Sequence, residues 1–118
     1  MLSIDLCTEI FVPVRDGEPD EGSGYTLGPE WVLTAHHVLF GDDVDEDEQA
    51  DITIVWRQAC KQANGEPPLV SVKRKQIAWA DPKRDLALIR CPLPDLGVEV
   101  PRAEHLVARF IPDDAQTS

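Results

Sequence analysis

The adjacent histidines His36 and His37 are the residues of this sequence best suited to proton transfer, because an imidazole accepts and releases a proton near neutral pH. They lie near the end of residues 22–39, GSGYTLGPEWVLTAHHVL. This stretch has the pattern of a β-hairpin followed by a short helical segment. A side chain at the junction between a rigid sheet and a turn can point into a cleft.

Local signals predict this hairpin and its surroundings. Residues 25–27 and 31–34 are rich in strand-forming side chains. Gly28-Pro29-Glu30 separates them as a turn, because glycine supplies unusual dihedrals and proline presets its own. Residues 35–39 then make roughly one helical turn. Gly22-Ser23-Gly24 indicates a place where the backbone passes close to another part of the fold.

Two motifs carry a resemblance to a known family. Residues 32–38, Val-Leu-Thr-Ala-His-His-Val, resemble the first catalytic motif of trypsin-like (chymotrypsin-fold) serine peptidases, and residues 85–88, Asp-Leu-Ala-Leu, are similar to the second. The order of histidine before aspartate also fits this family and differs from other families that use the same triad. The resemblance implies that His37 is the general base and that Asp85 orients it, with His36 in the usual alanine position.

The family's third motif, Gly-x-Ser-Gly in a second β-barrel, is absent from this chain. None of its serines has the surroundings of a nucleophile, and its cysteines all lie in what the resemblance makes the first barrel; they are Ser3, Ser23, Ser71, Ser118, Cys7, Cys60 and Cys91. The family's oxyanion hole and specificity pocket belong to the second barrel too. We expect no useful peptidase activity from this chain alone, since losing the nucleophile costs on the order of a millionfold in turnover in a comparable triad.

Composition agrees with one domain and excludes some partners. The chain has 118 residues, and 42% of them are hydrophobic, which is ordinary for a globular protein. Its formal net charge of −11 argues against nucleic acid or an anionic membrane as a partner. Much of this charge lies in one segment, residues 41–51, which we call the acidic loop.

The acidic loop, the tryptophans and the basic triplet have simpler interpretations than ligand binding. The loop resembles the start of an EF-hand, yet Glu48 and Ile54 stand where that motif needs glycine and glutamate. We expect a solvated turn, with cation binding left open, and we expect no cofactor and no metal. Trp31, Trp56 and Trp79 are predicted to be core residues. The basic triplet at residues 73–75 is predicted to be an exposed strand face, with pairing to the acidic loop left open.

Three cysteines is an odd count, and their spacing fits neither a zinc site nor a disulfide framework. Secreted relatives in the family usually carry a cysteine directly after the catalytic histidine, where this chain has Val38. Residues 1–15 lack the pattern of a signal peptide or a membrane span. We therefore expect a reducing, cytoplasmic location. The resemblance further suggests a bacterial protein in which such domains are fused to other modules.

The fold class predicted is all-β, a single six-stranded antiparallel Greek-key barrel with one short helical turn at the histidine, equivalent to half of the family's double barrel. Six strands are expected, at residues 10–15, 25–27, 31–34, 52–56, 69–79 and 86–91. The domain is expected to span residues 1–111, with a crossover segment from about residue 92, and residues 112–118 are expected to form a flexible tail.

Two functions compete at this stage. The first is the amino-terminal half of an intracellular trypsin-like serine endopeptidase that acts on a peptide or protein substrate and is inactive alone. The alternative is a peptidase-derived module that only binds or regulates. In either case the face that carries His37 and Asp85, which in the family packs on the second barrel, would be uncovered, so we expect self-association or a partner polypeptide, which in the first case carries the serine.

Overall fold

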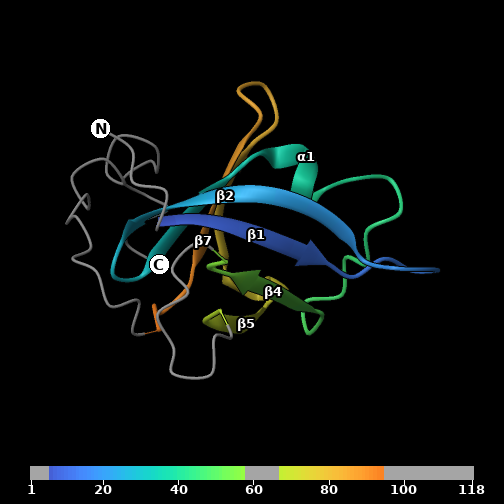
Figure 1. Ribbon diagram of the computed structural model, residues 1–118. Helices are drawn as coiled ribbons and strands as arrows, with labels where there is room; N and C mark the ends of the chain where they lie inside the picture. The colour runs from blue at the N-terminus through green and yellow to red at the C-terminus, as the bar shows by residue number, and fades with distance from the viewer. Residues whose placement is uncertain (1–5, 58–66, 95–118) are drawn as a thin grey trace.

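A computed structural model describes residues 6–57 and 67–94. The described part is mostly β, with seven antiparallel strands in one sheet that curls into a half-barrel, and one short helix (Figure 1). The strand order is β5-β4-β1-β2-β3-β7-β6. The elements in chain order are β1 (Cys7–Val12), β2 (Asp20–Gly28), β3 (Trp31–Thr34), α1 (His36–Leu39), β4 (Asp51–Val55), β5 (Leu69–Lys73), the 3-10 turn η2 (Arg74–Gln76), β6 (Ile77–Asp81) and β7 (Leu86–Arg90).

The predicted strand count of six is wrong, because the single long strand expected at residues 69–79 is two strands. β5 pairs with β4 at one end of the sheet, whereas β6 pairs with β7 at the other. The chain must therefore turn between them, and it does so at η2. There the backbone amides of Arg74 and Lys75 donate to the carbonyls of Ala50 and Glu48 at the end of the acidic loop.

The prediction that residues 73–75 form an exposed strand face is also wrong at its centre. Arg74 is buried, with 7% of its surface exposed. Its guanidinium lies over the ring of Phe40, 4.8 Å from the ring centroid. The expected pairing with the acidic loop does occur beside it, since the Lys73 ammonium lies 2.8 Å from the Asp51 carboxylate.

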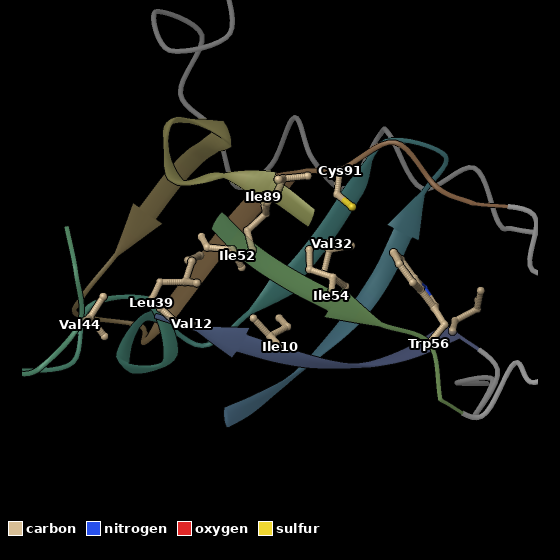
Figure 2. Close-up of a cluster of buried hydrophobic side chains, with 13 residues drawn as sticks. Ile10, Val12, Val32, Leu39, Val44, Ile52, Ile54, Trp56, Ile89 and Cys91 are labelled. Atoms are coloured by element: carbon tan, nitrogen blue, oxygen red, sulfur yellow. The ribbon is translucent and has the colours of Figure 1, made fainter. Parts of the chain in front are cut away.

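The main core fills the concave side of the curled sheet. Alternate residues of β1 and β4 point into it, and Figure 2 shows Ile10, Val12, Ile52 and Ile54 in this core, where Ile10 and Ile54 are direct partners on the two adjacent strands. Trp56 is fully buried there, as predicted for a core tryptophan. Period-two alternation is what a sheet with one buried face requires.

A second, smaller apolar cluster lies on the opposite face of the sheet. Leu88 is fully buried, and it packs with the partly buried Leu27, Trp31, Leu33 and Trp79. Leu88 alternates along β7 with Ala87 and Ile89, which face the main core. The strands β3 and β7 therefore carry apolar side chains on both faces. We call this cluster the outer cluster.

The hairpin of β2 and β3 positions the histidines. Its turn and its second strand are confirmed, while its first strand is longer than predicted and begins at Asp20. The close approach predicted at residues 22–24 is confirmed too. A Cβ on Gly22 would lie 2.5 Å from the Val38 side chain of α1, and one on Gly24 would lie 2.6 Å from Thr8. The hairpin and α1 are thus packed without room for a methyl group.

Two further predictions concern the ends of the chain. β1 begins at Cys7 and ends before Pro13, three residues earlier than predicted, since proline has no amide proton for a ladder hydrogen bond. The predicted barrel end at residue 111, most of the crossover segment and the tail at residues 112–118 lie outside the described residues.

Candidate active site

His37 is held in place by a helix that is fixed on two sides. α1 begins directly after β3, because Ala35 is still extended, with φ −81° and ψ 145°. Leu39 is fully buried in the main core, and Val38 packs against Gly22 of β2. The Phe40 amide donates to the His36 carbonyl and closes the single turn. The ring of His37 consequently points away from the core.

Asp85 is presented by the loop between β6 and β7, which lies beside α1 (Figure 1). The Asp81 carboxylate accepts a hydrogen bond from the Lys83 amide at 3.0 Å and stabilises the start of this loop. Asp85 itself has φ 56°, in the left-handed region. Aspartate tolerates this region better than most residues, but such a conformation in a non-glycine residue is uncommon and often marks a functional position.

The structure brings His37 and Asp85 together through two hydrogen bonds. The His37 amide donates to Oδ1 of Asp85 at 2.8 Å, and the ring Nδ1 lies 2.7 Å from Oδ2. A proton on Nδ1 is held by the carboxylate, which leaves Nε2 as the acceptor. This is the tautomer that a general base needs. We call the pair the His37–Asp85 dyad.

The same two hydrogen bonds set the charge of Asp85. The backbone amide of His37, and next its ring, lower the pKa of the Asp85 carboxyl. Asp85 is therefore an anion at neutral pH, and it would stabilise an imidazolium formed on His37. Both side chains face solvent, with 74% of His37 and 51% of Asp85 exposed. Water screens the pair, so its field is weaker than in a closed site.

The other histidine and the cysteines have different surroundings. The His36 ring stacks on Phe40 with 4.4 Å between centroids, and it is absent from the hydrogen bonds of the dyad. Cys91 is buried, and burial raises the pKa of its thiol to about 11. A thiol with so high a pKa is a poor nucleophile at neutral pH. Cys7 lies on β1, and Cys60 is outside the described residues.

The serines of the described residues make their hydrogen bonds outside the dyad. Ser71 lies on β5 at one end of the strand order, and its hydroxyl is 3.2 Å from that of Thr53. Ser23 lies on β2, where its carbonyl accepts a hydrogen bond from the Thr34 hydroxyl at 2.7 Å. Ser3 and Ser118 are outside the described residues. Among the described residues, no serine hydroxyl is therefore hydrogen-bonded to His37 or Asp85.

The acidic loop uses its own carboxylates to fold. Asp45 accepts a hydrogen bond from the Asp47 amide at 3.0 Å, and Asp47 accepts one from the Gln49 amide at 2.8 Å. These are local turns of the kind that aspartate commonly stabilises. Across residues 6–57 and 67–94, no cluster of three or more histidine, cysteine or acidic side chains is placed to hold a metal ion.

Arg74 is the residue that the sequence interpretation missed. Its burial has no local signal, because Arg74 lies in η2, after the end of β5, and packs against Phe40. Arg74 and Phe40 also line a pocket beside β6.

No protein-family model matches this chain, and no curated protein matches its sequence at a significant level.

Within the described part of the chain, no helix has the length and apolar character needed to cross a membrane.

Proposed function

We propose that this chain is the amino-terminal barrel of a trypsin-like serine endopeptidase and contributes two of its three catalytic residues. The observation that carries the proposal is the His37–Asp85 dyad, in which a carboxylate binds both the amide and Nδ1 of one histidine. The residues of the pair are 48 positions apart in sequence. In this reading the curled sheet corresponds to the Greek-key first barrel of the family.

In the proposed mechanism, Nε2 of His37 takes the proton of a serine hydroxyl supplied by a second barrel or polypeptide. It then returns the proton to the leaving amine of the substrate. Asp85 keeps the ring in the required tautomer and stabilises its protonated form. The exposure of both side chains supports a site that is completed by another surface, since a peptidase excludes water from its triad.

The test is to purify the protein from its own host with everything bound to it. We expect intact mass spectrometry to find a longer chain or a tightly bound polypeptide that contains Gly-x-Ser-Gly. A fluorophosphonate probe should label that serine, and the label should be lost in His37→Ala. His36→Ala is the matched control and should keep the label, because His36 is absent from the dyad's hydrogen bonds. A lone 13.1 kDa chain that the probe never labels would contradict the proposal.

The second candidate is a peptidase-derived module that binds or regulates without catalysis. The lack of a nucleophile among residues 6–57 and 67–94 favours it, and a stable, unaccompanied chain would be its expected form. For such a module, replacing His37 or Asp85 should leave its binding partners unchanged and abolish no activity, and this distinguishes it from the first candidate.

A further inference from the structure

Arg74 carries a buried charge without a hydrogen-bond partner among the described residues. The residue is 7% exposed, and both terminal nitrogens, Nη1 and Nη2, are buried and unpaired. The ring of Phe40 contacts the flat face of the guanidinium, so the edge that donates hydrogen bonds remains unused. An unpaired buried cation is costly, and native proteins nearly always pair such a group.

The unpaired guanidinium lies in the wall of a pocket. The pocket has a volume of about 460 Å³ and lies between the acidic loop and β6; it is lined by Phe40, Glu46, Glu48, Arg74, Lys75 and residues 77–80. β6 is the last strand of the sheet, and within the described residues its outer edge pairs with no strand. Such an edge can receive an extended peptide as an additional strand.

The charges around the pocket favour a single carboxylate as the ligand of Arg74. Arginine stays protonated at neutral pH, although burial lowers the pKa of Arg74 while Glu46 and Asp45 act in the opposite direction. Arg74 and Lys75 balance the two glutamates of the wall. A carboxylate fits the planar fork of the guanidinium through two hydrogen bonds. A phosphate carries up to two negative charges, and the glutamates and the net charge of −11 would repel it more strongly.

Access to the guanidinium requires a small movement. Nη1 and Nη2 are shielded from solvent. Glu46 and Glu48 are exposed residues at the rim, and their side chains can rotate away without disturbing the core. A carboxylate that reaches Arg74 would compete with Glu46 and Asp45, which act electrostatically on its guanidinium.

We propose that the pocket between the acidic loop and β6 binds an extended peptide, whose backbone pairs with the outer edge of β6 and whose Asp or Glu side chain is held by Arg74. This site is independent of the His37–Asp85 dyad. The proposal of peptide binding can therefore fail while the proposed peptidase function holds, and the reverse is also true.

The test is an NMR titration of the full-length chain with two matched peptides, acetyl-Val-Glu-Val-amide and acetyl-Val-Gln-Val-amide. We expect the glutamate peptide to shift the Arg74 guanidinium signals and the amide signals of β6 in a saturable manner. The glutamine peptide should bind at least about tenfold more weakly, because it makes no charged hydrogen bonds. Arg74→Met should abolish this preference, whereas Lys75→Met should retain it.

The remaining outcomes decide against the proposal. Equal binding of the two peptides, binding that Arg74→Met leaves unchanged, or no binding at millimolar peptide would each overturn it. Tighter binding of inorganic phosphate than of the glutamate peptide would replace the peptide with a phosphate ligand. If Arg74→Met does not fold, the comparison of the two peptides on the unmodified chain still decides, since it needs no variant.

Discussion

The Asp85 carboxylate accepts two hydrogen bonds from His37, and this contact gives the first prediction at the scale of single residues. Its pKa in the folded protein lies below the ordinary value of 3.8. A lowered folded-state pKa means that the charged form favours the folded state. The contribution is complete above the unfolded pKa, and it is lost as the pH falls through the folded pKa.

Asp85→Asn should therefore lower the free energy of unfolding at pH 6, and the difference from the unmodified chain should shrink below about pH 4. Denaturant unfolding between pH 2 and pH 7 measures it. His37→Ala is an informative companion, because its backbone amide still donates to Asp85. Its free energy of unfolding at pH 6 should therefore fall by less, relative to the unmodified chain, than that of Asp85→Asn. A variant that follows the unmodified chain at every pH would show that the contact contributes nothing to folding.

A buried hydroxyl gives the second prediction at this scale. The Thr26 hydroxyl donates to the Leu6 carbonyl at 2.9 Å and accepts from the Trp56 indole N–H, also at 2.9 Å. Thr26 and Trp56 are fully buried. Thr26→Val keeps the shape of the side chain but leaves the indole N–H and the carbonyl without this partner.

We expect Thr26→Val to reduce the free energy of unfolding by about 1–3 kcal/mol. Thr53→Val is the control, since its hydroxyl contacts Ser71 on the exposed side of the sheet and water can replace that partner. Chemical denaturation compares the two variants. Equal losses at both positions would show that the buried pair has no special role.

At the scale of elements, local signals explain which parts of the fold were predictable. The turn at residues 28–30, the strand after it and the helical turn of α1 depend on glycine, proline and strand formers that are close in sequence. The break at η2 was not predictable in this way. It exists because β5 and β6 pair with different strands, and that pairing is a long-range property of the sheet.

The candidate site likewise has features that local sequence patterns predict and features that they do not. The position of His37 at the end of a hairpin follows from local patterns. Its contact with Asp85 spans 48 residues, and it was expected from the resemblance to a peptidase motif and not from spacing. The pocket at Arg74 was missed, because the burial of that side chain depends on Phe40 and the acidic loop.

The packing of the hairpin against α1 gives a prediction for these two elements. A methyl group at Gly22 would overlap the branched side chain of Val38, with carbon atoms 2.5 Å apart. Gly22→Ala should therefore displace the helix that carries His37 and cost about 1–3 kcal/mol of stability. The NMR signals of the His37 ring should shift as well.

Gly41→Ala is the matched control for this packing. A Cβ there would lie 3.5 Å from the carbonyl oxygen of His37, which is ordinary van der Waals contact. We expect little change in stability and a much smaller shift of the His37 ring signals than in Gly22→Ala. If Gly22→Ala behaves like Gly41→Ala, the hairpin does not fix the position of α1.

At the scale of the whole molecule, the distribution of apolar surface bears on the proposed partner. The described residues bury one core inside the curled sheet and hold the outer cluster on its other face. Trp31, Leu33 and Trp79 are only partly buried there. Apolar groups that stay partly open over several strands commonly mark a surface that contacts another protein.

We expect the purified chain to self-associate, or to bind a partner polypeptide, through the outer cluster. Light scattering should report a mass above that of one chain, and the association should strengthen with salt, because screening reduces the repulsion between chains of net charge −11. Leu33→Gln should weaken the association. Leu69→Gln is the control, since Leu69 is 58% exposed but lies on β5, outside this cluster. A monodisperse monomer in both low and high salt would contradict the prediction, and it would favour a domain that functions alone as a binding module.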